Sequence, residues 1–230
     1  VRLPYAFSWF LDAVSPQWEA LATPDYSYVM PLPVKRKFGI PYVIQPRWTQ
    51  QLGVFSKESV TTEIVNEFLR HIRYLSYDFN LNFGNVGAFK SLPNRIIELS
   101  ANYNTIQQAF SKNTKRNISK AEQSGLSVQI IDYQVLVDFW RSQNGDKPAE
   151  LGSKLPLLCA AAQQHKMGVC YGVFTANHEL VATLMTLETD SRIIYLVPTS
   201  NALGKELCAM FLLVDYLLKK NAGSAKVFDC

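Results

Sequence analysis

The chain has 230 residues, of which 48% are hydrophobic and 18% are charged, and its formal net charge is +4. These values are ordinary for a globular protein, and the length allows one large domain or two small ones with a substantial core. The small positive charge permits an anionic partner but argues against RNA binding without chemistry, and we expect no DNA partner.

No segment has the length and composition of a membrane-spanning helix. Such a helix needs about 20 predominantly apolar residues, and the most apolar window, 207–218, is shorter and contains Asp215. We interpret the four cysteines, which have no CxxC spacing, as reduced thiols of a cytoplasmic protein: Cys159, Cys170, Cys208 and Cys230. Because the chain starts at Val1 and stops just after a predicted strand, we expect both termini to be incomplete.

The N-terminal region predicts a helix followed by several strands. The helix covers 5–14 and ends at Ser15-Pro16. Strands are predicted after it, over 18–23, 26–34 and 40–45. We place the adjacent charges Lys35, Arg36 and Lys37 at a hairpin tip. The favoured interpretation is a solvated turn, with phosphate contact by Lys35 and Arg36 as the alternative.

Residues 61–75 predict a helix, since Ile64 and Phe68 recur at helical spacing and Thr61 is able to cap its start. His71 lies on this helix among apolar neighbours and has no second ligand at metal spacing. We therefore interpret His71 as a structural residue and expect no metal site.

Three segments flank this helix. Residues 47–55 are irregular, and three polar or aromatic side chains there are candidates for lining a groove: Trp48, Gln50 and Gln51. Residues 77–83 alternate apolar and polar side chains, which predicts a half-buried strand. Residues 95–99 predict another strand.

A long polar helix is predicted over 104–124, with Gly125 as its stop. Its basic residues form one stripe, which comprises Lys112, Lys115, Arg116 and Lys120. Two interpretations remain open: contact with the phosphates of a tRNA or a nucleotide-linked acceptor, or a solvated face balanced by carboxylates such as Glu122.

The rest of the chain predicts strand, helix, helix, three strands, helix, strand. The strands cover 126–131, 169–174, 180–187, 192–197 and 225–228, and the helices cover 133–142, 155–166 and 205–220, with a loop over 145–154. The N-terminal half repeats a similar order. We therefore predict an α/β (α+β) protein of two duplicated units, 1–100 and 101–230, each a mixed sheet flanked by helices.

Residues 198–204 predict a turn-rich loop between a strand and a buried helix. Such crossover units place ligands at the carboxyl end of the first strand. Two interpretations remain open. The backbone amides near Asn201 and Gly204 bind an anion, or these two residues only turn the chain and cap the helix. On the first interpretation, Gly204→Val abolishes ligand binding in a folded protein.

This order of elements resembles the GNAT (Gcn5-related N-acyltransferase) fold, in which the corresponding loop receives the pyrophosphate of coenzyme A. The fingerprint Gln/Arg-x-x-Gly-x-Gly/Ala corresponds to Asn201-Ala-Leu-Gly204-Lys-Glu206, where one glycine matches and the first and last positions differ. The resemblance implies that the cofactor is contacted by Pro198, Thr199, Ser200, Asn201, Gly204 and Lys205.

The stretch Lys112 to Leu126 (KNTKRNISKAEQSGL) resembles the T-R-x-N-I-x-K-A-x-x-x-G motif of the Fem family, the peptidoglycan-branching aminoacyltransferases. These enzymes consist of two GNAT-like units side by side. The resemblance implies acyl or aminoacyl transfer to an amine, with an acyl-CoA or aminoacyl-tRNA as co-substrate and no tightly bound cofactor. The acceptor is then a small molecule or a cell-wall precursor, which points to cell-wall biogenesis.

In this fold a backbone amide at the end of the fourth strand stabilises the oxyanion, which nominates Leu196 and Val197. Glu188 and Tyr195 are candidates for proton transfer, each with a structural role as the alternative. A second class of function remains open: a catalytically degenerate copy that binds a phosphorylated ligand or a protein partner. The departures from the fingerprint at Asn201 and Glu206 favour that alternative.

Overall fold

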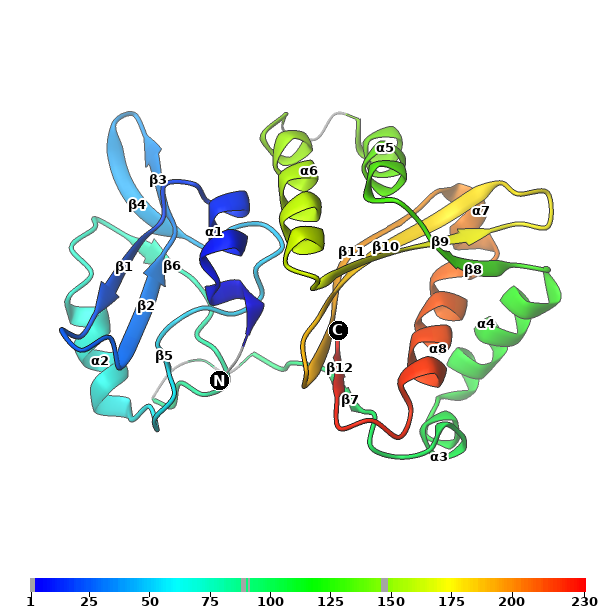
Figure 1. Cartoon of the computed structure of the whole chain (residues 1–230), viewed down its shortest axis with the longest axis horizontal. Coiled ribbons are helices and arrows are strands. Elements are labelled where there is room, and N and C mark those ends of the chain that lie inside the picture. The colour runs from blue at the N-terminus through cyan, green and yellow to red at the C-terminus, as the bar shows by residue number, and fades with distance from the viewer. Residues whose placement is uncertain (1–2, 88–89, 91, 146–148) are drawn as a thin grey trace. The chain divides into compact units, whose positions relative to one another are not determined.

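The structure is a computed structural model that describes residues 3–87, 90, 92–145 and 149–230. The chain has a mixed α/β architecture and divides into two compact units, Val1–Leu92 and Pro93–Cys230 (Figure 1). The sequence placed this division near residue 100. It lies earlier because strand β7 (Ile96–Glu98) pairs with the C-terminal strand β12 (Val227–Asp229), which ties residues 93–100 to the second unit.

The first unit contains two small sheets instead of one. One sheet has the order β1-β2-β5, with bounds Glu19–Ala22, Tyr28–Leu32 and Phe55–Ser56. The other has the order β3-β4-β6, with bounds Val34–Lys37, Ile40–Ile44 and Tyr77–Asp78. The helical elements are a 3-10 turn over Pro4–Ala6, α1 (Ser8–Val14) and α2 (Thr62–Arg70). The hydroxyl of Thr61 accepts from the amide of Ile64 at 3.4 Å, so the predicted cap of α2 is confirmed.

Three predictions for the first unit are wrong in detail. Lys35, Arg36 and Lys37 lie on β3, and the hairpin turns at Phe38-Gly39, where both residues have positive φ. Helix α2 ends at Arg70. Only residues 77–78 of the predicted strand 77–83 pair as a strand. The predicted alternation holds at the half-buried Phe79 and Leu81, but Asn82 is buried and Phe83 is exposed.

The burial of Asn82 has a clear cause. Its side chain is buried and donates to the carbonyls of Leu52 (2.8 Å) and Val54 (3.0 Å), while Phe83 is exposed. The same carbonyls also accept from the backbone amide of Asn82 and from the side chain of Asn85, so Asn82 belongs to a hydrogen-bonded network that joins residues 52–54 to residues 82–85.

The second unit is built on a six-stranded sheet of order β7-β12-β11-β10-β9-β8. The strands not yet located are β8 (Ser127–Ile130), β9 (Gly168–Phe174), β10 (Leu180–Glu188) and β11 (Arg192–Ser200). The helices are α3 (Tyr103–Gln108), α4 (Lys112–Gln123), α5 (Tyr133–Asn144), α6 (Ala149–Gln164), α7 (Ala202–Glu206) and α8 (Ala209–Asn221). From β8 onward the predicted order of elements is confirmed, except that two helices, α7 and α8, stand in place of the last predicted helix. Helices α5 and α6 cover one face of the sheet, and α8 with α4 covers the other (Figure 1).

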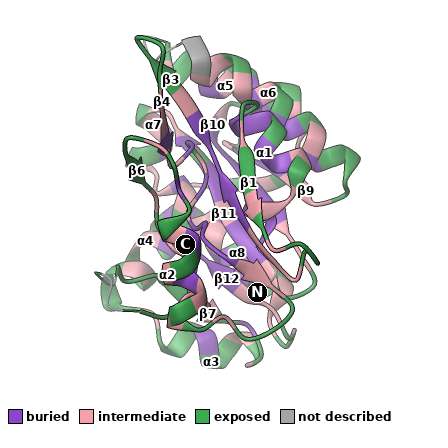
Figure 2. Cartoon of the chain, turned by 90° about the vertical axis from the view of Figure 1, so that its left-hand side faces the viewer, coloured by how far each residue is buried: buried purple, intermediate pink, exposed green. Residues whose placement is uncertain are grey.

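The core of the second unit lies between the sheet and α8. Side chains from the central strands and from α8 are fully buried there, including Leu184, Ile193, Leu213, Leu217 and Phe228. Figure 2 shows β10 and β11 buried along most of their length. Each such side chain contributes about 1.5–3 kcal/mol by burial, so the geometry of β10 and β11 is the most strongly determined part of the unit.

The predicted helix 104–124 is two helices. Ser111 breaks it, because its hydroxyl accepts from the amide of Thr114 at 3.1 Å and so starts α4 as a new helix. Helix α6 begins at Ala149, within the predicted loop 145–154, of which residues 146–148 lie outside the described residues.

The predicted loop 198–204 is also different. Residues 198–200 continue β11, and Asn201 begins a short helix, α7. The predicted helix 205–220 is interrupted at Cys208, whose φ of 59° is left-handed. This residue lets α7 contact β10 and β11 while α8 takes its own course across the core.

Candidate functional site

Strand β11 carries a β-bulge at the position nominated for catalysis. Met185 of β10 pairs with Val197, and the next residue, Thr186, pairs with Tyr195. Leu196 is therefore the extra residue of β11, with no partner in the register of β10. A bulge leaves its extra residue outside the ladder and redirects the neighbouring groups, and such features are common next to active sites. The backbone amide nominated for the oxyanion therefore lies at an irregularity of the strand.

The bulge also changes which face each later residue of β11 presents. Before it, Tyr195 shares a face with Thr186 and packs against the α8 core. After it, Val197 shares a face with Met185, whose sulfur lies 3.5 Å from that of Cys159 on α6. The predicted site residues are consequently divided between the two faces of the sheet.

The predicted cofactor residues 198–200 lie on a strand. Pro198, Thr199 and Ser200 pair with Leu184, Thr183 and Ala182 of β10. β11 pairs with β12 from Arg192 to Ile194. Pro198 lies beyond these residues, so its missing N–H does not interrupt this parallel pairing.

Asn201 caps α7. Its side-chain oxygen accepts from the amide of Gly204 at 2.7 Å, and its carbonyl accepts from Lys205 at 3.1 Å. A Cβ on Gly204 would lie 2.1 Å from the carbonyl oxygen of Val181, so this glycine is required by the approach of α7 to β10. Packing therefore explains Gly204 without a ligand.

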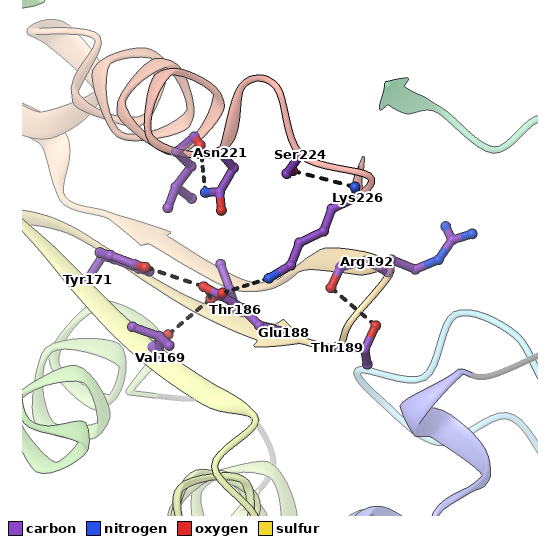
Figure 3. Close-up of polar contacts among 10 residues, drawn as sticks. Val169, Tyr171, Thr186, Glu188, Thr189, Arg192, Asn221, Ser224 and Lys226 are labelled. Carbon is purple, nitrogen blue, oxygen red and sulfur yellow. Dashed lines mark hydrogen bonds and ion pairs between the residues drawn. The ribbon is translucent and has the colours of Figure 1, made fainter. Parts of the chain in front are cut away.

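The two candidates for proton transfer share the α8 face. The carboxylate of Glu188 accepts from the hydroxyls of Thr186 and Tyr171, both at 3.4 Å, and lies 3.8 Å from the ammonium of Lys226 (Figure 3). Thr186 is in turn the register partner of Tyr195. The structure thus brings Tyr195 and Glu188 to the same face beside the bulge.

The protonation of the tyrosines follows from their burial. Burial raises the pKa of Tyr195 to about 12, and the charge of Cys230 adds to the effect. Burial, followed by the charge of Glu188, also raises the pKa of Tyr171. At neutral pH both phenols keep their protons, so Tyr195 is able to donate a proton and is a poor base.

The basic stripe of α4 is exposed. Lys112, Lys115, Arg116 and Lys120 point away from the buried side of the helix, which Ile118 and Ala121 form. Arg116 donates to Asn113 at 2.8 Å, and Lys115 donates to the carbonyl of Gln108 at 3.2 Å. Within the described ranges none of the four is ion-paired with a carboxylate, Glu122 included.

In the first unit, Lys35 and Arg36 lie on β3, and Arg36 donates to the carbonyl of Gly39 at 3.4 Å. Of the groove candidates, Gln51 is buried and accepts from the amide of Phe83 at 3.0 Å, which gives it a structural role. Trp48 has a left-handed φ of 61° and is half-buried.

The described residues contain no group of three His, Cys, Asp or Glu side chains arranged to hold a metal. Among them there is also no helix with the length and apolar character needed to cross a membrane. All four cysteines have free thiols; Cys159 and Cys170 are buried, Cys208 is half-buried and Cys230 is exposed.

Comparison with known proteins gives a match at the level of structure alone. No family model and no curated protein matches the sequence. The solved structure of FemX aligns with 97% of this chain and 82% of its own, at 10% identity and a TM-score of 0.66. This chain has a FemX-like fold.

Two further structures align over nearly the whole chain. L-PGS from Bacillus licheniformis aligns with 96% of this chain and 73% of its own, at 13% identity and a TM-score of 0.52. A conserved protein of unknown function from Bacteroides thetaiotaomicron aligns with 98% of this chain and 79% of its own, at 6% identity and a TM-score of 0.54. The predicted GNAT-type fold is confirmed, and at these identities the likeness concerns the FemX-like fold and not the reaction.

The sequence did not nominate Thr183, which the register places opposite Thr199. A signal was nevertheless present. Thr183 and Thr186 are hydroxyl residues in the mostly apolar strand β10, and a buried hydroxyl needs a hydrogen-bond partner.

Proposed function

We propose that the second unit transfers an aminoacyl or acyl group to an amine. The observation that carries this proposal is the bulge at Leu196, which places the nominated backbone amide at an irregularity in the middle of a buried strand. Such a preorganised donor is what the oxyanion of acyl transfer requires. The FemX-like fold supports it, together with the motif from Lys112 to Leu126, which resembles that of the Fem aminoacyltransferases.

Aminoacyl-tRNA is the favoured donor, for two reasons. First, the amide of Gly204 is already occupied by Asn201, and Glu206 brings negative charge to α7, so the elements that would hold a coenzyme A pyrophosphate are weak. Second, the exposed cations of α4 suit the phosphates of an RNA. The acceptor is then an amine of a cell-wall precursor or a small molecule, and the reaction is cytoplasmic.

The decisive experiment removes the backbone N–H of Leu196 and keeps strand β11 folded. Proline is tolerated at bulges, so Leu196→Pro deletes the N–H at the extra residue of the strand. Leu196→Ala is the matched control, because it shortens the side chain and keeps the amide. We expect transfer from aminoacyl-tRNA to fall by about 10²–10³-fold in Leu196→Pro relative to Leu196→Ala, with circular dichroism unchanged.

The donor is identified by thermal denaturation with acetyl-CoA and with alanyl-tRNA. A ligand at 100 times its dissociation constant stabilises the folded protein by about 2.7 kcal/mol. A shift with alanyl-tRNA supports the favoured donor, and a shift with acetyl-CoA alone overturns that choice. Equal transfer rates in the two Leu196 variants would remove the bulge from the mechanism.

A catalytically degenerate binding protein is the second candidate. The capped start of α7 favours it, because Asn201 and Gly204 are both explained by packing. It predicts that ligand binding persists while no donor is consumed. Tight binding without turnover in the wild-type protein would favour this candidate over transfer.

A further inference from the structure

Two buried threonine hydroxyls face each other across β10 and β11. Thr183 and Thr199 are register partners, so their side chains emerge on the same face of the sheet. Thr183 is 0% exposed and Thr199 is 8% exposed. Neither hydroxyl has a hydrogen-bond partner among the residues that the structure describes.

An unpartnered buried hydroxyl costs about 1–3 kcal/mol, and valine would fill the same volume without that cost. Two such groups in direct apposition are therefore unfavourable for folding alone. The bulge at Leu196 creates the apposition, since without the extra residue Thr199 would face the α8 side of the sheet. The bulge that carries the nominated amide thus also turns Thr199 toward Thr183.

The position of the pair suggests what it meets. Thr199 lies three residues beyond Leu196, which is about 10 Å along a strand, and two residues before Asn201, where the chain turns into α7. An acyl donor whose carbonyl lies at Leu196 and whose carrier arm extends along β11 would pass Thr199. Thr199 keeps 8% of its surface exposed and Thr183 none, so a donor group would reach the pair from the Thr199 side.

The chemistry of the surroundings limits the ligand. The neighbours on this face, Met185 and Val197, are apolar and buried. An ionised group would lose its hydration there without compensation, whereas an amide or a hydroxyl would find two groups that both donate and accept.

We propose that Thr183 and Thr199 together bind a neutral hydrogen-bonding group in the carrier arm of the acyl donor, between the reacting carbonyl and the phosphates. In an aminoacyl-tRNA this group is a ribose hydroxyl, and in an acyl-CoA it is an amide. The proposal rests on the proposed transfer function, and it makes the two threonines binding residues for the donor.

Thr183→Val and Thr199→Val test it, with Thr186→Val as the matched control. Thr186 is equally buried on the same strand, but its hydroxyl donates at 3.4 Å to the carbonyl of Val169 and to Glu188. We expect the first two variants to bind the donor about 3- to 10-fold more weakly with an unchanged or higher thermal midpoint. Thr186→Val should show a lower midpoint and unchanged donor affinity.

The probes are alanyl-tRNA, the same tRNA ending in 2′-deoxyadenosine, and acetyl-CoA. If the ribose hydroxyl is the ligand, the deoxy substitution and Thr199→Val weaken binding non-additively. A parallel loss with acetyl-CoA identifies the amide instead. Unchanged affinity for both donors in both variants, or a midpoint lowered as in Thr186→Val, overturns the proposal. If the wild-type protein neither binds nor consumes any donor, the proposed function itself fails.

Discussion

The guanidinium of Arg192 lies 2.5 Å from the carboxylate of Asp229, and the two side chains are 13% and 0% exposed. The other carboxylate oxygen of Asp229 accepts from the side chain of Asn94 at 3.0 Å. Arg192 is the first residue of β11 and Asp229 the last of β12, so the pair holds the parallel strands together and joins them to the segment that leads into β7.

Removal of the cation should destabilise the second unit strongly. Arg192→Met leaves the carboxylate of Asp229 buried without its counter-charge, and we expect the free energy of unfolding to fall by about 3–5 kcal/mol. The control is Arg141→Met, which removes the exposed pair of Arg141 with Asp138 at 3.9 Å and should cost less than about 1 kcal/mol. Urea denaturation measures both. A similar small loss in the two variants would show that the buried pair does not hold the strands together.

Gly204→Ala should impair folding before it impairs binding. The new Cβ would lie 2.1 Å from the carbonyl oxygen of Val181, so α7 must move away from β10. We expect a loss of about 1–3 kcal/mol, measured by thermal denaturation. Gly152→Ala is the control, because that glycine lies inside α6, where an added Cβ would meet open space. Alanine also favours a helix over glycine. An unchanged thermal midpoint in Gly204→Ala would contradict the packing role and leave ligand binding as the explanation for this glycine.

The free energy of unfolding should depend on Tyr195 at alkaline pH. Burial raises the pKa of Tyr195 to about 12 in the folded protein, whereas an unfolded tyrosine titrates near pH 10. Between about pH 10 and pH 12 the folded state holds more protons at this site, so the free energy of unfolding falls as the pH rises. Over this pH range the free energy of unfolding should fall by about 2 kcal/mol less in Tyr195→Phe than in the wild-type protein. Parallel pH profiles from urea denaturation would contradict the assigned burial.

The cations of α4 should matter for RNA and not for folding. Arg116→Ala and Lys120→Ala remove exposed charges that have no carboxylate partner among the described residues. Each should leave the thermal midpoint nearly unchanged and reduce the slope of log K against log salt for tRNA binding by about 1. Arg70→Ala, an equal loss of charge on an exposed helix of the first unit, is the control. Identical salt slopes in all three variants would make the stripe a solvated face.

Local chemistry allowed much of the fold to be predicted. The alternation and helical spacing of apolar residues are properties of short segments, and they predicted the order of elements in the second unit. The cap at Thr61 was also predictable, since a threonine before an apolar helical repeat has few other roles. The same order of elements, together with the motif from Lys112 to Leu126, led to the GNAT and Fem resemblance that the structural comparison supports at the level of fold.

Some local features were present in the sequence but ambiguous. Ser111 is an ordinary polar residue inside a polar helix until its hydroxyl is seen to start α4. Asn82 looked like the exposed half of an alternating strand, and it is buried because its side-chain amide donates to two carbonyls of a distant segment. In both cases the partner, and not the residue type, decides the outcome.

The sequence by itself determined the order of helices and strands, the apolar stretches that form the core and the resemblance in fold. The tertiary structure alone decided the register of β10 against β11, and with it the bulge at Leu196 and the apposition of Thr183 and Thr199. The physical reason is the period of two in a strand: one extra residue moves every later side chain to the opposite face. No composition or spacing within β11 reveals that extra residue, because it exists only in relation to the neighbouring strand.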